Sequence, residues 1–256
     1  MRDTEREDRY GNLLGSEAYR RSRRGKARVI AHLCASELRA ARRIADLGAG
    51  TGLIKRELEK VAGRRILGFD IDPAFFVERR GMVLADVRRL PLRGGDFDLL
   101  IVNHLYEHVP DPGALFREVA RVLAPGGRAY VTAGSRLAIV EPHFRLPFLS
   151  WLPTGLADRY VRATGRGGSY EGIRFLSYRP LTRLIRASGL SIHDITERAL
   201  DELIDSTWGS AWARIWAVCR RAPAGLRRRA LEVLSPQWFF LLEKPAGEPA
   251  RPPEAK

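Results

Sequence analysis

Two groups of residues in this sequence have the types and spacing that chemistry requires. The first is the segment 46–52 (DLGAGTG), in which an acid precedes three glycines at alternate positions. Because glycine has no Cβ, such a turn lets a ligand approach the backbone and adopts dihedral angles that other residues avoid. An apolar run precedes the turn and a helical pattern over 53–61 follows it. Free N–H groups at the start of that helix are therefore expected near the ligand.

The second group consists of histidines that follow two later apolar runs. His104 and His108 come after the run 97–103, and His143 comes after the next run, close to Glu141. Histidine titrates near neutral pH, so it is the natural general base for a hydroxyl nucleophile. Open α/β sheets bind ligands beyond the carboxyl ends of their strands. We therefore expect the histidines and the glycine turn to share one edge of a sheet.

Alternating apolar runs and helical patterns provide the elements that must position these groups. A helix is expected to start at Asp111 with an acidic cap and a proline at its first position, and to end at the Pro-Gly-Gly of 125–127. Such alternation predicts a parallel sheet covered by helices. The predicted strands are 44–47, 65–70, 82–87, 97–103, 128–132, 190–196 and 237–245.

Other parts of the chain differ in character from this core. We expect an N-terminal segment, 1–42, that frays over 1–25 and is helical over 26–39. Residues 134–177 and 197–235 are predicted insertions that form a cap, and the second carries Trp208, Trp212 and Trp216 at helical spacing. The Pro- and charge-rich tail 246–256 is predicted to be disordered.

Five ordered motifs resemble those of class I S-adenosylmethionine-dependent methyltransferases. They are residues 46–52, Asp70, Asp86, 103–109 (NHLYEHV) and 121–127 (RVLAPGG). The resemblance implies an α/β fold with a doubly wound, mostly parallel seven-stranded sheet, insertions after strands five and six, and an antiparallel last strand. It also implies one methyltransferase domain over 1–245. An NAD-binding unit is the alternative, but it leaves Asp46 and Asp86 without a role, and Leu53 replaces its third glycine.

The resemblance also implies the cofactor, S-adenosylmethionine, and the residues that hold it. The glycine turn would bind the amino-acid moiety of the cofactor. Asp70 would accept hydrogen bonds from its ribose hydroxyls and Asp86 from its adenine amino group. Asn103 would line the methyl-bearing end. Carboxylates suit hydroxyl and amine donors. The complete predicted set is Asp46, Gly48, Ala49, Gly50, Gly52, Asp70, Ile71, Asp86, Val87 and Asn103.

Residues 107–108 (Glu-His) also resemble the Glu-x-x-Glu-His pattern of ubiquinone-type O-methyltransferases, in which acids and histidine can bind a divalent metal. Here His104 stands in place of the first glutamate. We therefore predict no metal. The catalytic candidates are His104, His108 and His143.

The first insertion holds a dense apolar cluster followed by arginines. This composition favours a lid over the active site or a dimer contact, and the alternative is an element at 137–166 that lies on an anionic membrane. The apolar members are Phe144, Leu146, Phe148, Leu149, Trp151 and Leu152.

The charge of the chain is strongly positive, with 44 Lys and Arg residues against 30 acids, a net +14. Such an excess indicates an anionic partner or a compositional bias towards arginine. Cys34 and Cys219 cannot form a disulfide framework. With no signal peptide and no run of about 18 apolar residues, we expect a cytoplasmic protein or one peripheral on the inner face of the membrane.

These observations predict methyl transfer to a hydroxyl or carboxyl of a small-molecule, glycan or lipid-linked acceptor. The alternative is a nucleic-acid (rRNA or tRNA) methyltransferase. Residues 103–106 (NHLY) lack the two prolines that amino-directed nucleic-acid enzymes usually carry there. A non-catalytic cofactor-binding protein is the third possibility, and the sequence leaves the oligomeric state open.

Overall fold

The computed structural model describes residues 16–166, 169–207 and 210–246. Its strands are β1 (Ile44–Leu47), β2 (Ile66–Asp70), β3 (Met82–Leu84), β4 (Phe97–Asn103), β5 (Leu123–Gly134), β6 (Ser191–Asp194) and β7 (Gln237–Glu243). Its α-helices are α2 (Glu17–Leu33), α3 (Ala35–Ala40), α4 (Leu53–Ala62), α5 (Pro112–Val122), α6 (Thr154–Ala163), α7 (Tyr178–Ala187), α8 (Thr196–Thr207), α9 (Ser210–Cys219) and α10 (Ala224–Leu234). Short 3₁₀ turns are η1 (Pro73–Phe75), η2 (Tyr106–His108) and η3 (Leu149–Trp151).

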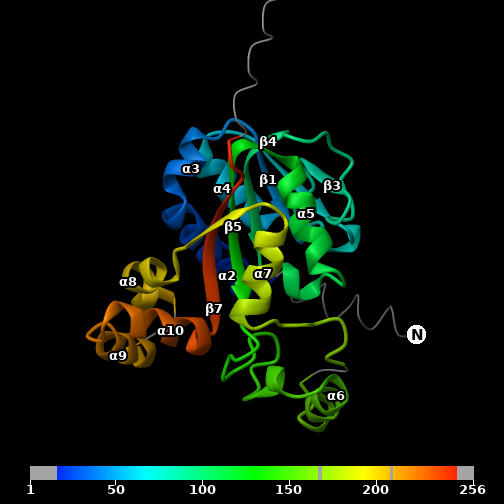
Figure 1. The fold of residues 1–256 in the computed structure, drawn as a ribbon. Helices are drawn as coiled ribbons and strands as arrows, with labels where there is room; N and C mark the ends of the chain where they lie inside the picture. The colour runs from blue at the N-terminus through cyan, green and yellow to red at the C-terminus, as the bar shows by residue number, and fades with distance from the viewer. Residues whose placement is uncertain (1–15, 167–168, 208–209, 247–256) are drawn as a thin grey trace, which may run out of the picture.

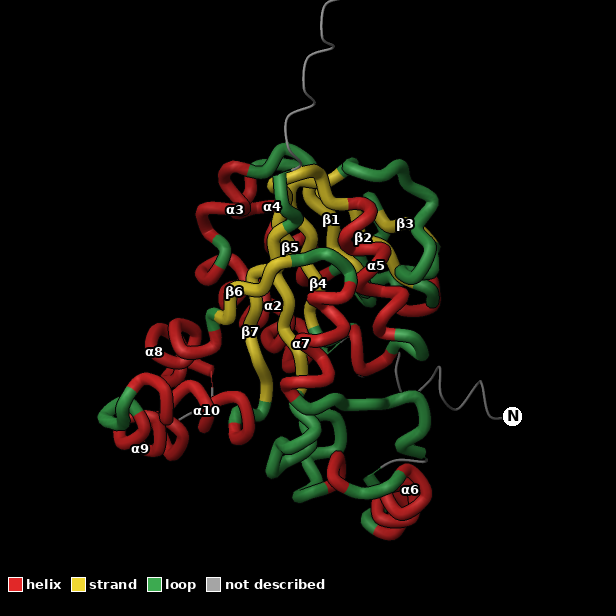
Figure 2. Tube along the Cα trace, viewed as in Figure 1, coloured by secondary structure: helices red, strands yellow, loops and turns green. Residues whose placement is uncertain are grey.

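Within the described residues, the strands form one seven-stranded sheet in the order β3-β2-β1-β4-β5-β7-β6. The neighbours among β1 to β5 pair in parallel, whereas β7 runs antiparallel between β5 and β6. Helices lie on both sides of this central layer (Figures 1 and 2). The predicted fold class is confirmed, including the antiparallel last strand.

Strand β4 shows why the sheet is covered on both faces. Its residues Leu99 and Ile101 pack in one hydrophobic core with α2, α3 and α4. The alternate residues Leu100 and Val102 pack in the other core, with α5 and α7. Because side chains alternate across a strand, a continuous apolar run is what a strand buried on both faces requires.

The N-terminal helix differs from the prediction for residues 1–42. Residues 17–25 are helical rather than frayed, because Ser16 caps α2 by accepting from the Tyr19 N–H at 3.2 Å. The predicted single helix over 26–39 is wrong, since the chain leaves helical geometry at Cys34 and α3 follows. The predicted disordered tail, from residue 247 on, lies outside the described residues.

The Pro-Gly-Gly segment 125–127 also behaves differently from the prediction. It was expected to end α5, but the helix ends at Val122 and the segment lies inside β5. Gly126 takes a positive φ of 74°, and its N–H donates to the Lys244 carbonyl at 2.9 Å. The pairing register between β4 and β5 shifts between Phe97 and Leu99. This bulge keeps the segment within the sheet.

Both predicted insertions leave the sheet at the same end. Gly134 at the end of β5 pairs with Gln237 at the start of β7, so residues 135–177 and α8 to α10 lie at one end of the molecule (Figure 1). Their described apolar side chains form two separate clusters, one around Leu149 and one around Trp216. The side chains of Trp208 and Trp212 fall outside what the structure describes.

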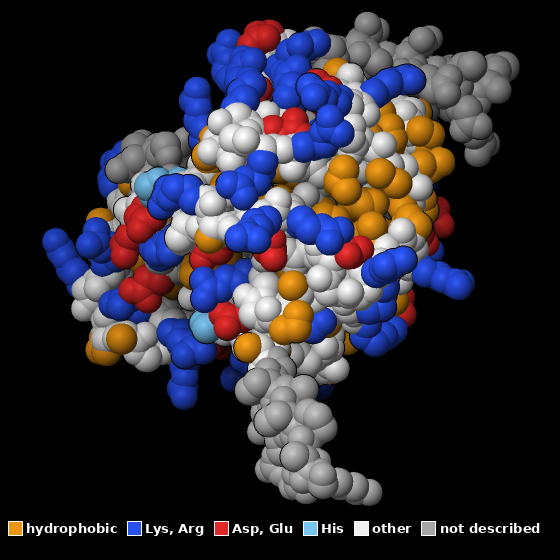
Figure 3. All heavy atoms as spheres, turned by 90° about the horizontal axis from the view of Figure 1, so that it is seen from above, with side chains coloured by type: hydrophobic (Ala, Val, Ile, Leu, Met, Phe, Trp, Pro, Cys, Tyr) orange, Lys and Arg blue, Asp and Glu red, His pale blue; other side chains and the backbone are white. Residues whose placement is uncertain are grey.

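The basic residues are spread over the described surface. Seen from above the view of Figure 1, Lys and Arg side chains are scattered over the face shown, outnumber the acidic ones, and leave an apolar patch on one side (Figure 3). No described helix is long and apolar enough to span a bilayer.

Candidate active site

The glycine turn joins β1 to α4 in the predicted place. Gly48, Gly50 and Gly52 have φ values of 69°, 52° and 73°, a region that residues with a Cβ rarely adopt. A Cβ on Gly48 would lie 2.5 Å from Leu105, whereas one on Gly50 would meet nothing within 4 Å. The turn therefore presents open space above Gly50, which is where a ligand can approach the backbone.

Two acids lie against this turn from neighbouring strands. Asp70, at the end of β2, accepts from the Gly50 N–H at 2.7 Å and from the Asp72 N–H at 3.1 Å. Asp46, in β1, is 3% exposed. Burial raises the pKa of Asp46 to about 7; Lys55 opposes this effect and the charge of Asp70 adds to it. A cationic ligand beside Asp46 would favour its ionised form.

Two apolar residues predicted to contact the cofactor follow β2 and β3. Ile71 is 65% exposed, and Val87 is buried in the core. Asp86 behaves differently from the expected free carboxylate: the Arg88 guanidinium donates to both of its oxygens, with the shortest contact at 2.6 Å. Asp86 must share its oxygens with Arg88 if it binds an amino group.

The segment after β4 carries a strained histidine against a buried acid. His104, next to Asn103, has a positive φ of 51°. Its Nδ1 lies 3.2 Å from Oε1 of Glu107, whose side chain is fully buried. Burial lowers the pKa of His104, and the contact with Glu107 only partly offsets this. Burial opposes the charge of Glu107, but the hydrogen bond from His104 holds the pKa of that carboxyl below its ordinary value.

Tyr106 links the first insertion to the segment that follows β4 through hydrogen bonds. Its hydroxyl donates to the Gly134 carbonyl at 2.5 Å and accepts from the Leu176 N–H at 3.1 Å. Gly134 and Leu176 are the two ends of the insertion, so one buried tyrosine holds both ends beside β4. The residues carried by the insertion are thereby placed next to those that follow β4.

His143 and His108 meet across these two segments. His143 Nδ1 lies 2.6 Å from Oε1 of the fully buried Glu141, and His143 Nε2 lies 3.2 Å from His108 Nε2. The two rings are nearly perpendicular, with centroids 4.9 Å apart. Burial lowers the pKa of His108. The structure thus brings all three predicted histidines to the carboxyl edge of the sheet.

Three of these side chains lie close enough to share an ion. Glu107, His108 and His143 each offer one donor atom, and these atoms lie within 4.8 Å of one another. The Glu107 Oε2 atom is buried without a hydrogen-bond partner. Glutamate and histidine are workable ligands for zinc.

Sequence analysis missed Lys26, which α2 directs towards the same edge. Burial, with help from Arg23, lowers its pKa to about 8, against the field of Glu107. Lys26 sits in a basic segment without a distinguishing pattern. Its position follows from the packing of α2 on the sheet, which no local motif shows.

Comparisons with known proteins agree with this fold. Residues 45–131 match the family model described as a methyltransferase domain. The ubiquinone biosynthesis O-methyltransferase of Marinobacter nauticus is 25% identical over 170 residues, covering 61% of this chain and 67% of the relative. That of Bordetella bronchiseptica is 27% identical over 173 residues, covering 57% and 70%.

Solved structures show the same fold at lower identity. The YcgJ protein of Bacillus subtilis aligns with a TM-score of 0.50 at 17% identity, covering 86% of this chain and 98% of its own. The cyclase SpnF aligns with a TM-score of 0.51 at 19% identity, covering 85% and 81%. The match of residues 45–131 to a methyltransferase domain and the names of the curated relatives support an S-adenosylmethionine-dependent methyltransferase, and the solved structures share its α/β fold.

Proposed function

We propose that this methyltransferase acts on a hydroxyl group of a small-molecule acceptor and that His143 is its general base. The observation that carries the proposal is the contact of His143 with the buried Glu141 on one side and with His108 on the other. A neutral imidazole whose Nδ1–H donates to a carboxylate leaves Nε2 free to accept a proton. The names of the curated relatives, which are O-methyltransferases, support the same class of acceptor.

The proposed cofactor seat is the turn between β1 and α4 with the ends of β2, β3 and β4. Its open space above Gly50, together with the exposed Ile71, fits a ligand with one polar and one flat apolar part. The residues assigned to it are Asp46, Gly48, Ala49, Gly50, Gly52, Asp70, Ile71, Asp86, Val87 and Asn103. Asp70, tethered to the Gly50 N–H, keeps lone pairs for ribose hydroxyls.

Bound S-adenosylmethionine supplies a methyl group already activated by its positive sulfur. The protein must then hold the acceptor oxygen in line, remove its proton and exclude water. In this proposal His143 Nε2 takes the proton, His108 orients the acceptor hydroxyl, and the His104–Glu107 pair braces the segment after β4. Tyr106 keeps the insertion over the reacting groups.

The class of acceptor is tested with radiolabelled methyl groups. The enzyme is incubated with labelled S-adenosylmethionine and an extract of the source cells, which is then separated into lipid, polysaccharide, RNA and small-molecule fractions. Label in a small-molecule or lipid fraction that survives mild alkali excludes a methyl ester, and identification of the labelled product as a methyl ether by mass spectrometry supports the proposal. Label that alkali releases as methanol marks a carboxyl acceptor, and label in RNA overturns the proposal.

The acceptor is also proposed to reach the enzyme at an anionic membrane. The apolar residues of the first insertion differ in exposure. Leu146 and Leu149 are buried, whereas Phe148 and Trp151 are 48% and 44% exposed. The two exposed rings pack edge to face, with centroids 4.9 Å apart, and Ile139, Val140 and Leu156 are also exposed. Arginines in the insertion would attract anionic headgroups.

Replacing both Phe148 and Trp151 with serine is expected to reduce sedimentation with phosphatidylglycerol vesicles several-fold. Both rings are about half exposed, so the melting temperature should change little. Val61→Ser removes an apolar side chain that is 55% exposed on α4 and serves as the control. Equal sedimentation of wild type and double variant would exclude this membrane contact and leave a lid as the role of the insertion.

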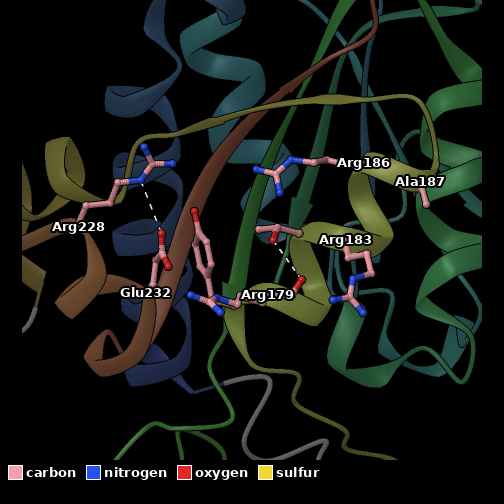
Figure 4. A pocket seen from close by; sticks show the side chains of 8 residues that line it. Arg179, Arg183, Arg186, Ala187, Arg228 and Glu232 are labelled. Atoms are coloured by element: carbon pink, nitrogen blue, oxygen red, sulfur yellow. Dashed lines mark hydrogen bonds and ion pairs between the residues drawn. The ribbon is translucent and has the colours of Figure 1, made fainter. Parts of the chain in front are cut away.

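A nucleic acid is the second candidate acceptor, favoured by an arginine-lined groove between α7 and α10. The groove has a volume of about 700 Å³. Arg179, Arg183 and Arg186 line one side, and Arg228, paired with Glu232 at 3.6 Å, lines the other (Figure 4). Within the described part of the chain, no carboxylate lies within ion-pair distance of the three α7 arginines. Unpaired guanidinium groups suit phosphates.

This candidate predicts salt-dependent RNA binding through the groove. Converting Arg183 and Arg186 to glutamate should weaken binding of a single-stranded RNA and lower the slope of log K against log salt by about 1.4, at roughly 0.7 for each lost phosphate contact. Fluorescence anisotropy at several salt concentrations measures the affinity for RNA and its dependence on salt. Arg93→Glu with Arg56→Glu changes the net charge equally, away from the groove. Identical losses in both double variants would show non-specific attraction only.

A further inference from the structure

We propose that Glu141 is a positioning residue that fixes the tautomer of His143 and so makes Nε2 of that ring the base. This inference rests on the proposed function, since it explains how one histidine of three becomes the proton acceptor. It concerns a residue in the first insertion, outside the glycine turn and the strand ends. Two independent contacts of the Glu141 carboxylate carry it.

The first contact fixes the carboxylate itself. Glu141 Oε2 accepts from the Phe144 N–H at 2.7 Å, and the side chain is fully buried. The surrounding turn is closed by two backbone bonds: the Glu141 N–H donates to the Leu146 carbonyl at 3.0 Å, and the Arg145 N–H donates to the Glu141 carbonyl at 2.8 Å. Arg145 has a positive φ of 53°. The carboxylate therefore has one orientation in a rigid turn.

The second contact fixes the imidazole. Glu141 Oε1 lies 2.6 Å from His143 Nδ1, and a carboxylate can only accept, so the proton of the neutral ring belongs on Nδ1. The Phe175 ring lies 5.7 Å from the imidazole centroid and restricts its rotation. The lone pair of Nε2 then points towards His108, 3.2 Å away. In the structure His108 Nε2 occupies this hydrogen-bonding position, and an acceptor hydroxyl that enters between the two rings would meet the same lone pair while still contacting His108.

The burial of Glu141 also explains how the charged product of proton transfer is tolerated. When His143 accepts a proton, the resulting imidazolium lies beside the fully buried Glu141 carboxylate. An opposite charge at hydrogen-bond distance favours the charged ring. An acid in this arrangement orients its histidine and stabilises the imidazolium without itself becoming protonated, as in carboxylate–histidine pairs of other enzymes.

Glu141→Gln tests this role directly, because the Phe144 N–H constrains the new amide. The amide oxygen must stay on that N–H, which turns the amide NH₂ towards His143 Nδ1. Nδ1 must then accept, so the proton moves to Nε2 and the base is lost. The expected result is a fall in kcat of roughly 10²-fold or more, with unchanged KM for cofactor and acceptor. Glu171→Gln, an exposed acid of the same insertion, is the matched control.

The tautomer is measured independently of activity by the ¹⁵N chemical shifts of His143. Wild type should show a protonated Nδ1 and an unprotonated Nε2, and Glu141→Gln should show the reverse. Glu141→Asp, which keeps the charge, should recover part of kcat. If Glu141→Gln does not fold, the wild-type spectrum alone decides: a proton on Nε2 at neutral pH overturns the inference.

The outcomes separate this inference from the proposed function. If His143→Gln abolishes transfer but Glu141→Gln does not, His143 remains the general base and the positioning role of Glu141 is excluded. If neither variant changes kcat, the base itself is wrong. If a chelator abolishes activity and zinc restores it, His143 Nε2 binds an ion through the Glu107, His108 and His143 group, and the inference is overturned.

Discussion

Substituting His143 with glutamine is expected to lower kcat by roughly 10²- to 10⁴-fold, the usual contribution of a positioned general base. The glutamine amide can still donate to the buried Glu141 carboxylate in place of Nδ1–H, so the substitution should have little effect on folding. Affinity for S-adenosylmethionine should remain within about twofold, since the glycine turn belongs to a different segment. Single-turnover methyl transfer measures the chemical step, and calorimetric titration measures cofactor binding.

The control for this variant is His193→Gln. His193 lies on the edge strand β6, is 59% exposed and contacts Glu243, so its loss should leave transfer unchanged. His108→Gln should give a smaller loss that appears in KM for the acceptor, because His108 is assigned to orientation. Should His143→Gln retain full kcat while His108→Gln abolishes it, the roles of these two histidines would have to be exchanged.

The sheet could be predicted from the sequence because its signals are local. Residue 97 and residues 99–102 of the run 97–103 are apolar, and β4 has the bounds of this run. Asp111 caps α5, as predicted, by accepting from the Ala114 N–H at 3.0 Å. The glycine turn lies between β1 and α4, since glycines at alternate positions allow the positive φ values that the turn requires.

Local signals failed where a tertiary contact decides the structure. The Pro-Gly-Gly of 125–127 has the composition of a helix end, yet pairing with the chain around Lys244 keeps it in β5. The meeting of His108 and His143, 35 residues apart, depends on Tyr106 holding both ends of an insertion. Arg88 reaches Asp86 two residues away, which a motif comparison does not consider.

Gly50→Ala is expected to weaken S-adenosylmethionine binding by tenfold or more while costing about 1 kcal/mol of folding stability. The stability cost arises because alanine is strained at a φ of 52°. The affinity cost has a different cause: the added Cβ would enter the open space above the turn, where nothing of the protein lies within 4 Å. A tenfold loss of affinity corresponds to about 1.4 kcal/mol.

Gly63→Ala is the matched control because it introduces the same backbone strain at a position outside the proposed cofactor site. Gly63 ends α4 with a φ of 64°, and a Cβ there also meets nothing within 4 Å. Both variants should lower the free energy of unfolding in urea by similar amounts, but only Gly50→Ala should lose cofactor affinity in a calorimetric titration. Wild-type affinity in both variants would place the cofactor away from Gly50. Equal losses of affinity would mean that strain alone, transmitted through α4, governs binding, and the assignment of Gly48, Gly50 and Gly52 to the cofactor seat would fall with it.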